Sequence, residues 1–276
     1  MSERVPMKIS QLADRFGSNR MNAAEPAKFL RGCSCVAVPF AGGLCEVPHF
    51  TANVILVNDL DRHVMNLAAV VRDDPRRLTE LCDKTLFHPD ELVKAQDICK
   101  RKRESESPCM EWAHAYYVAS WMTRGGKMGS KGEFDQGMSV RWKSGGGDSV
   151  VRFRNSTEGI TEWSEAVKPC TFTTLDCFEF LTQCKKRDIP ENGIYADPPW
   201  PDDGANYTHS FTEPMHRKLT ELLASFERSR IVVRFGDHPL IRELYPETVW
   251  AWNLLKSRTQ ANKEKAEVLL TRNTKE

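Results

Sequence analysis

Blocks of apolar and polar residues predict a strand and a tight turn near the start of the chain. The apolar, β-branched run CSCVAVPFAGGLCEV (33–47) is broken by Pro39 and enters the glycine pair Gly42 and Gly43. This pattern is typical of a strand that ends in a turn. A glycine turn after a strand lets backbone N–H groups approach a ligand closely.

The next block, NVILVNDLDRHVMNLAAVV (53–71), predicts a second strand that passes into a helix. The strand is expected to end near Val57, and Asn58 or Asp59 to cap the helix. Apolar residues then recur at helical spacing, at Val64, Leu67, Ala68 and Val71. Together with the glycine turn and the acid, these elements are typical of the start of a Rossmann-like unit.

The same alternation resumes after residue 170, where apolar runs predict strands and amphipathic stretches predict helices. The predicted strands are TFTTLD (171–176), which is expected in the core, IYADPPW (194–200), RIVVRF (230–235) and KAEVLLTRN (265–273). The predicted helices are CFEFLTQCKKR (177–187) and EPMHRKLTELLASF (213–226). The order predicts an α/β fold with one doubly wound sheet.

A segment from about residue 75 to 168 interrupts this alternation. It is helical and charged up to about residue 125, and then rich in Gly, Ser and basic residues. Alternating pieces in its second part, MSVRW (138–142) and SVVRFR (149–154), predict small exposed strands. We therefore expect a sheet domain formed by residues 1–74 and 169–276, with an insertion at 75–168.

The composition is that of an ordinary soluble globular protein. Of 276 residues, 40% are hydrophobic and 28% are charged, and 39 basic against 38 acidic residues give a formal net charge of +1. The total charge gives no argument for a nucleic-acid partner, so any basic surface must be local. The sequence has no run of 18 apolar residues and no secretory signal, which predicts a cytoplasmic protein without a membrane span.

The nine cysteines predict buried, reduced thiols. They include no C-x-x-C pair, and no histidine pair stands at metal-ligand spacing, so no metal site is expected. An odd number of scattered cysteines is typical of a reducing compartment. Most of them are expected to be small buried apolar residues.

The motif IYADPPW places an acid, two prolines and an aromatic residue directly after an apolar run. The two prolines cannot continue a central strand, so the strand must end at Asp197. Asp197, Pro198, Pro199 and Trp200 are then presented at the carboxyl end of a strand, where open α/β sheets bind ligands. Taken alone, the motif is equally typical of an edge strand that merely stops.

The glycine turn and the acid after the second strand point to a nucleoside-containing cofactor. Asp59 follows Gly43 by 16 residues, close to the spacing at which an acid holds a ribose hydroxyl pair. Neither G-x-G-x-x-G nor G-x-x-x-x-G-K-[ST] occurs, so a dinucleotide fingerprint is missing and an ATPase is disfavoured.

A cofactor turn followed by [D/N]-P-P-[aromatic] resembles the amino-methyltransferases that use S-adenosylmethionine (SAM). The chain resembles the Dam-type DNA adenine methyltransferases, and the resemblance runs in order over most of its length. FGSNR (16–20) resembles that family's N-terminal loop, PFAGGLCE (39–46) resembles its SAM turn, and ILVNDLDRHVMNL (55–67) resembles its acidic second strand. TTLDCFEFL (173–181) resembles the segment whose acid faces the cofactor's adenine. NYTHSFTEPMHRKL (206–219) resembles the family's later loop and helix, and EVLLTRN (267–273) resembles its closing strand.

The resemblance implies SAM-dependent methylation of the 6-amino group of adenine in double-stranded DNA, as in restriction–modification, by a monomer. The target base is flipped out of the duplex and catalysis falls to Asp197, Pro198, Pro199 and Trp200. The implied SAM-binding residues are Phe16, Gly17, Pro39, Phe40, Gly42, Gly43, Asp59, Asp176 and Cys177. The insertion at 75–168 lies where the family has its target-recognition region.

The residue types of the motif suit this reaction. The lone pair of an adenine amino group is delocalised into the ring, which makes the nitrogen a poor nucleophile. Two acceptors, the Asp197 carboxylate and the Pro198 carbonyl, would bind its hydrogens and localise the lone pair. Trp200 would stack on the flipped base, a contact worth roughly 1–3 kcal/mol. The sulfonium of SAM is already activated, so the transfer needs no metal.

Two residues depart from the family pattern. Val38 replaces the acid that usually precedes Pro-Phe, and Asn19 replaces a lysine of the N-terminal loop. Both changes remove a charge near the ligands. Weaker SAM binding, compensation by Glu46 or Arg20, and a degenerate copy of the enzyme all remain open.

Basic residues in the glycine-rich part of the insertion are the candidate DNA contacts. A strand or hairpin would project Arg141, Lys143, Arg152 and Arg154 from one face toward phosphates. The run KRKRE (100–104) is more typical of a solvated helix face. The tryptophans of the insertion, Trp112, Trp121 and Trp142, are expected in the core.

Three alternatives remain open at this point. RNA adenosine methyltransferases also use DPPW, but their catalytic loop precedes the cofactor turn, whereas here PFAGG (39–43) precedes DPPW (197–200). Transfer to the 4-amino group of cytosine would use the same acceptors. A non-catalytic DNA-binding protein on a decayed methyltransferase fold is favoured by Val38 and Asn19 and disfavoured by the intact DPPW.

Overall fold

The computed structural model describes residues 10–102, 108–125, 127–138, 140, 149–202, 204–258 and 264–272. The chain forms two compact units, which we describe separately. The sheet unit comprises residues 19–41, 49–60 and 169–276, and the helical unit comprises residues 1–18, 42–48 and 61–168.

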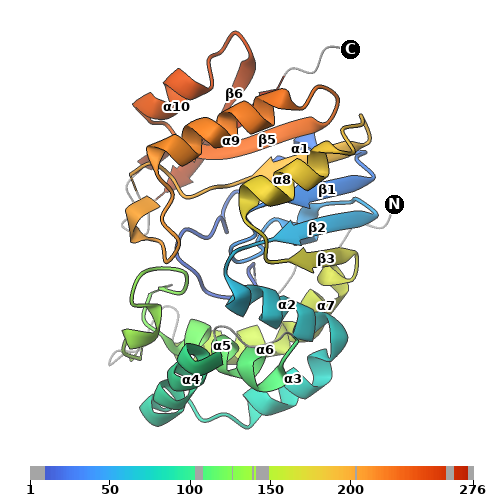
Figure 1. Cartoon of the computed structure of the whole chain (residues 1–276). Helices are drawn as coiled ribbons and strands as arrows, with labels where there is room; N and C mark the ends of the chain where they lie inside the picture. The colour runs from blue at the N-terminus through green and yellow to red at the C-terminus, as the bar shows by residue number, and fades with distance from the viewer. Residues whose placement is uncertain are drawn as a thin grey trace. The chain divides into compact units, whose positions relative to one another are not determined.

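The sheet unit is built on a seven-stranded sheet, counted over the described residues, in the order β3-β2-β1-β4-β5-β7-β6 (Figure 1). The first five strands in this order are parallel, whereas β7 runs antiparallel to β5 and to β6. The strands are β1 (Cys35–Val38), β2 (Val54–Asn58), β3 (Cys170–Thr173), β4 (Asn192–Ala196), β5 (Arg230–Gly236), β6 (Trp250–Arg258) and β7 (Glu264–Arg272). The expected Rossmann-like α/β sheet is confirmed.

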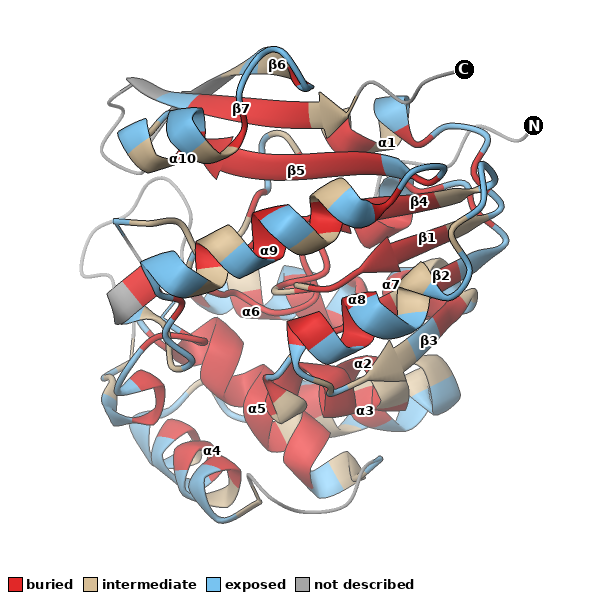
Figure 2. Ribbon diagram, turned by 45° about the horizontal axis from the view of Figure 1, so that its top comes forward, coloured by how far each residue is buried: buried red, intermediate tan, exposed pale blue. Residues whose placement is uncertain are grey.

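Three helices cover one face of this sheet: α8 (Cys177–Lys185), α9 (Glu213–Ser225) and α10 (Pro239–Leu244) (Figure 1). Leu181, Leu219 and Leu223 of α8 and α9 share one core with the strand residues Ile194 and Val233, and Figure 2 shows the central strands as buried. The unit also contains α1 (Glu25–Phe29) and a 3-10 helix at Gly204–Asn206. The sequence pattern predicts α8, α9, β5 and β7, but neither β6 nor α10.

The strand TFTTLD is only partly as expected. β3 forms at Cys170–Thr173, but it lies at the edge of the sheet rather than in the core. Cys170 is its one fully buried residue, because β3 has a neighbouring strand on one side only.

The helical unit contains α2 (Arg62–Asp73), α3 (Pro75–Asp83), α4 (Pro89–Lys102), α5 (Met110–Met122), α6 (Ser149–Glu158) and α7 (Ile160–Val167), with a 3-10 helix at Glu133–Asp135. Another 3-10 helix, Val47–His49, lies at a sequence boundary between the units. α5 contacts α2, α3, α4 and α6 and is buried almost throughout. Trp112 and Trp121 are buried, as expected, whereas Trp142 lies outside the described residues.

Two local predictions for this unit are wrong. Asp61, not Asn58 or Asp59, caps α2, since its carboxylate accepts a hydrogen bond of 2.9 Å from the N–H of His63. SVVRFR forms the start of α6 rather than a strand, because Phe153, Ser156 and Thr157 bury one helical face. MSVRW lies largely outside the described residues.

All nine cysteines are free thiols, and six of them are buried, as the sequence predicts. Over the described part of the chain, no helix is both long and apolar enough to cross a membrane.

Candidate active site

The DPPW motif forms the loop that follows β4. This strand is paired on both sides, with β1 and with β5, so the two prolines end an inner strand and not an edge strand. Ala196 is the last residue of β4, because the prolines that follow cannot donate to a neighbouring strand. Pro198 is buried, while the Asp197 side chain is 17% exposed. The motif therefore holds a partly accessible carboxylate at the carboxyl end of a central strand.

Each oxygen of the Asp197 carboxylate has a distinct partner. Oδ2 accepts a charge-assisted hydrogen bond of 2.8 Å from Arg234 on β5. Among the described residues, Oδ1 accepts only a long hydrogen bond, of 3.4 Å, from the indole N–H of Trp200. One oxygen is thus firmly held, and the other has capacity for a further donor.

Arg234 lies between two carboxylates. Its second nitrogen donates to Glu267 on β7 at 2.8 Å, and both side chains are less than 8% exposed. In the antiparallel pair of β5 and β7, Gly236 is opposite Glu267, so Arg234 and Glu267 are diagonal neighbours on one face of the sheet. One positive charge is thus shared by the buried carboxylate of Glu267 and the partly accessible carboxylate of Asp197.

Burial raises the pKa of the Asp197 carboxyl above its usual value, and the Arg234 guanidinium acts against this rise. Against its own burial, Asp197 and Glu267 hold the pKa of Arg234 well above the usual value of arginine. Arg234 is therefore charged at any pH at which the protein is folded.

Trp200 is fixed from one side. Arg234 lies over its ring, with the guanidinium carbon 5.1 Å from the ring centroid, and Gly236 packs against the same side chain. A Cβ built on Gly236 would lie 2.9 Å from two ring carbons of Trp200. Gly236 thus provides space that any larger residue would fill.

The strand register places the other candidate residues of the sheet unit at the same edge. Val38 pairs with Val57, and Ala37 pairs with Ile194, so Phe40, Asp59 and Asp197 each follow the end of a neighbouring parallel strand. Pro39 is buried and Phe40 half-buried, and Asp59 is half-buried. Phe40 meets the ring of Phe211 edge-on, at 5.7 Å between centroids.

Asn58 ties these loops together, a role that differs from the helix cap expected for it. Its amide donates to the carbonyl of Pro39 at 3.2 Å and to the carbonyl of Leu175 at 3.0 Å. Its oxygen accepts from the N–H of Leu175 at 2.9 Å and from the Thr173 hydroxyl at 2.8 Å. Asn58 is almost fully buried and so fixes the loops after β1 and β3 relative to Asp59.

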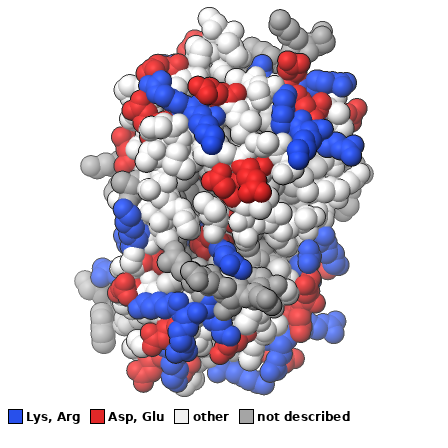
Figure 3. Space-filling model, viewed as in Figure 1, with Lys and Arg blue, Asp and Glu red and all other residues white. Residues whose placement is uncertain are grey.

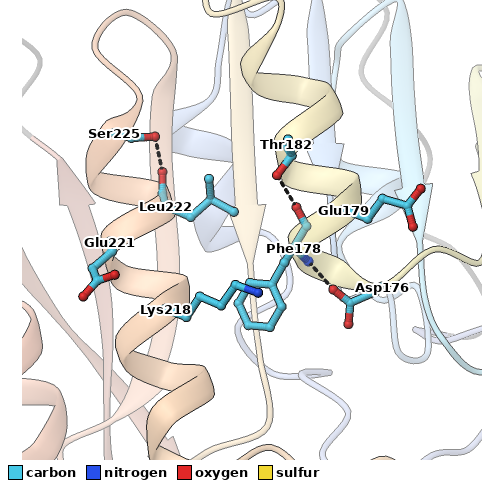
Figure 4. A pocket seen from close by; sticks show the side chains of 8 residues that line it. All are labelled: Asp176, Phe178, Glu179, Thr182, Lys218, Glu221, Leu222 and Ser225. Carbon is cyan, nitrogen blue, oxygen red and sulfur yellow. Dashed lines mark hydrogen bonds between the residues drawn. The ribbon is translucent and has the colours of Figure 1, made fainter.

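Asp176 is exposed at the start of α8 and caps it, accepting a hydrogen bond of 2.9 Å from the N–H of Phe178. The next residue, Cys177, is buried. Asp176 and Phe178 line an open groove of about 590 Å³ between α8 and α9 (Figure 4). In this groove the Lys218 ammonium lies 4.2 Å from the Phe178 ring centroid. Asp176 thus stands beside an aromatic ring, with its second oxygen free of the cap.

The remaining candidate cofactor residues lie in the helical unit. Gly42 and Gly17 have left-handed backbone conformations, with φ of +50° and +76°. Gly43 is packed so tightly that a Cβ would lie 3.0 Å from the Ser18 hydroxyl and 3.2 Å from the Ala13 carbonyl. The N–H of Phe16 donates to the carbonyl of Met128 at 2.9 Å. The positive φ angles therefore account for Gly17 and Gly42, and the close contacts account for Gly43.

The two departures from the family pattern occupy buried positions. Val38 is the last residue of β1 and is 2% exposed, so its apolar side chain belongs to the sheet. Asn19 is 5% exposed, and its side-chain oxygen accepts a hydrogen bond of 3.2 Å from the N–H of Asn22. Of the two residues expected to compensate, Glu46 is buried and Arg20 exposed.

Asp61, two residues after Asp59, has a structural role. It forms a buried ion pair with Arg15, which also donates to the Tyr116 hydroxyl at 2.5 Å. Burial acts to raise the pKa of Asp61, but Arg15 outweighs it and lowers the pKa to about 2. Of the two acids in NDLD, Asp61 is thus the one that belongs to this buried pair.

Only two of the four candidate DNA contacts lie within the described residues. Arg152 and Arg154 are both in α6, so the expected strand or hairpin is wrong for them, and two residues apart on a helix they do not share a face. Arg152 forms an ion pair of 2.7 Å with Asp14, whereas Arg154 is exposed. Arg141 and Lys143 lie outside the described residues.

Sequence reasoning missed Arg234, Glu267 and Gly236. Arg234 and Glu267 each stand among apolar residues in a predicted strand, and a charge inside such a run is the signal that marks them. Gly236 directly follows the predicted strand RIVVRF and carries no such signal. Their convergence on Asp197 and Trp200 depends on the pairing of β5 with β7, which the sequence does not reveal.

The strand order, with an antiparallel β7 between β5 and β6, and the DPPW loop at the end of β4 define a Rossmann-like methyltransferase. The model of the family "D12 class N6 adenine-specific DNA methyltransferase" matches residues 23–260. The chain belongs to this family, whose members are enzymes that use SAM to methylate adenine in DNA. No curated protein matched the chain.

Proposed function

We propose that this enzyme flips its target adenine out of double-stranded DNA and methylates the 6-amino group at the DPPW loop. The observation that carries the proposal is the Asp197 carboxylate. Arg234 holds one of its oxygens at 2.8 Å, while the other has, within the part of the chain that the structure describes, only a 3.4 Å partner. A flipped amino group needs one such acceptor. The Pro198 carbonyl is the second, since proline has no N–H to compete for the base.

Asp197 and Pro198 act on the amino nitrogen through its two hydrogens. Acceptors for both hydrogens favour a pyramidal nitrogen with a localised lone pair, which can attack a methyl group. As the N–C bond forms, positive charge develops on the nitrogen, and the adjacent carboxylate stabilises it before the extra proton leaves. Trp200 stacks on the base and offsets part of the few kcal/mol that unpairing costs.

The residues fit SAM as the methyl donor, which supplies a methyl group on a sulfonium and leaves as a thioether. Asp59 would accept hydrogen bonds from the ribose hydroxyls, and Asp176 and Cys177 would lie beside the adenine. The other proposed cofactor-binding residues are Pro39 and Phe40 of the sheet unit and Phe16, Gly17, Gly42 and Gly43 of the helical unit. The fit rests on the position of Asp59, which is half-buried and directly follows the end of β2.

The target sequence would be read by the segment at 75–168, acting on DNA as a monomer. Phosphate contacts position such a segment, and base contacts give its specificity. Within the described residues Arg154 is the exposed candidate for a phosphate contact.

Expression in a host without adenine methylation, followed by long-read mapping of modified bases, tests the proposal. We expect 6-methyladenine at one recurring short sequence, and none with the Asp197→Ala variant. Methylation of cytosine instead, or unmodified DNA despite a folded, SAM-binding protein, would contradict it.

A further inference from the structure

Arg234 and Glu267 form a buried ion pair next to the catalytic loop. Arg234 donates one nitrogen to Asp197 and another to Glu267, both at 2.8 Å. The side chains of Arg234 and Glu267 are 6% and 7% exposed, so the pair is shielded from water. A buried ion pair of this kind costs desolvation, and a network that spans three elements is therefore a candidate for a functional role.

We propose that Arg234, held in place by Glu267, is a positioning residue that fixes the Asp197 carboxylate and sets its charge for the target amino group. This inference rests on the proposed function of the DPPW loop. The planar guanidinium spans two carboxylates in one fixed geometry, which a lysine cannot do. It therefore orients the carboxylate plane and leaves Oδ1 for the base.

Glu267 limits how far Arg234 neutralises the negative charge of the Asp197 carboxylate. If Arg234 served Asp197 alone, it would neutralise the carboxylate and weaken it as an acceptor. Because Glu267 shares the guanidinium, the three groups keep a net negative charge when both carboxylates are ionised. Glu267 is also held in place, since the Asn22 amide donates to it at 3.3 Å.

Arg234 also fixes Trp200. The guanidinium lies over the indole ring at 5.1 Å from its centroid, and the indole N–H points to Oδ1 of Asp197. The same arginine thus positions both the acceptor of the amino group and the platform for the base.

The test compares three variants in steady-state methylation, SAM binding and DNA binding. Arg234→Gln should lower kcat by about 10²-fold, because a misplaced catalytic group costs about that much. SAM affinity should stay unchanged. Arg234→Lys keeps the charge but cannot span both carboxylates, so its kcat should lie between those of the parent and of Arg234→Gln.

The pH profile of kcat separates this role from a merely structural one. Among the described residues, the charged groups that act on Asp197 are Arg234 on β5 and Glu267 on β7, and Tyr195 on β4 acts on Arg234. Arg234→Gln removes the positive charge and should move the acid limb to higher pH. Glu267→Gln leaves Arg234 to Asp197 alone and should move the acid limb to lower pH. General damage to the fold cannot produce shifts of opposite sign.

Arg242→Gln is the matched control. Arg242 also pairs with an aspartate, Asp237, at 2.6 Å and lies 5.0 Å from a tryptophan ring centroid, that of Trp252, but it is exposed. Positive and negative side chains are mixed over this surface of α9 and α10 (Figure 3). Substitution of Arg242 should change neither kcat nor the pH profile of kcat.

The outcomes separate the two proposals. Unchanged kcat and acid limb in Arg234→Gln, or shifts of the same sign in Arg234→Gln and Glu267→Gln, would overturn the positioning role while the parent enzyme still methylates adenine. Failure of the parent enzyme itself to methylate adenine would refute the proposed function, and this inference with it.

Discussion

The indole ring of Trp200 packs directly against Gly236, so that a Cβ at Gly236 would lie 2.9 Å from two carbons of the ring. Gly236→Ala must therefore displace Trp200 or the end of β5. We expect a lower kcat and weaker binding of DNA with an extrahelical adenine, because the stacking platform moves. Stopped-flow methylation and fluorescence titration with such DNA measure both.

Gly137→Ala is the control for this change. A Cβ at Gly137 would meet nothing within 4 Å, so this variant should behave as the parent. Equal loss of activity in both variants would show that the effect of Gly236→Ala is not due to Trp200.

Much of the sheet could be predicted because its strands are continuous apolar runs with clear ends. The two prolines alone predict a strand end at Asp197, and β4 ends one residue earlier, at Ala196. α6 was missed because six alternating residues fit a strand and a helix equally well. In the folded unit, the ring of Phe153 contacts the rings of Tyr117 and Phe87, and these tertiary contacts favour the helix over the strand.

The site was harder to predict where it depends on contacts between distant strands. Arg234 and Glu267 are 33 residues apart, and nothing local links them. Asn58 has the right residue type and place for a helix cap, and only the structure shows it bonding to the loops after β1 and β3 instead. In each case tertiary contacts override the local signal.

Asp59 and Asp197 should affect different steps. Asp59→Ala removes the proposed ribose acceptor and should weaken SAM binding, whereas Asp197→Ala should leave SAM binding largely intact and abolish transfer. Isothermal titration calorimetry and single-turnover methylation measure the two steps. The reverse pattern would show that the two acids are wrongly assigned.

His216 should make stability depend on pH. It is 1% exposed between Phe211 and Phe235, and burial, with His238 adding and Glu213 opposing, lowers its pKa to about 4. The unfolded chain binds this proton near pH 6.5 and the folded one only near pH 4. The contribution of His216 to the free energy of unfolding is therefore complete above pH 6.5. As the pH drops from 6.5 to 4, this contribution falls by up to about 1.4 kcal/mol per pH unit.

His216→Gln removes this titration. Urea unfolding should therefore show that the parent and the variant differ in their free energy of unfolding by about 2 kcal/mol less at pH 5 than at pH 7.5. The exposed His209→Gln variant is the control and should show no such narrowing. A gap that stays constant would contradict the buried, neutral His216.

Arg154 is expected to contact a DNA phosphate. Arg154→Ala should weaken DNA binding and reduce its salt slope by about one unit, without changing SAM affinity. Arg101, exposed on α4 in the run KRKRE, is the control, and Arg101→Ala should leave the slope unchanged. An unchanged salt slope for Arg154→Ala would contradict the phosphate contact and show that the Arg154 side chain belongs to a solvated surface.

The central claim is that the DPPW loop transfers a methyl group to the 6-amino group of adenine in DNA. The most direct measurement is incubation of the purified protein with tritiated SAM and mixed-sequence duplex DNA, followed by nucleoside analysis. We predict label in 6-methyladenine, and none with Asp197→Ala. Label in cytosine or in RNA only, or no label although SAM binds, would contradict the claim.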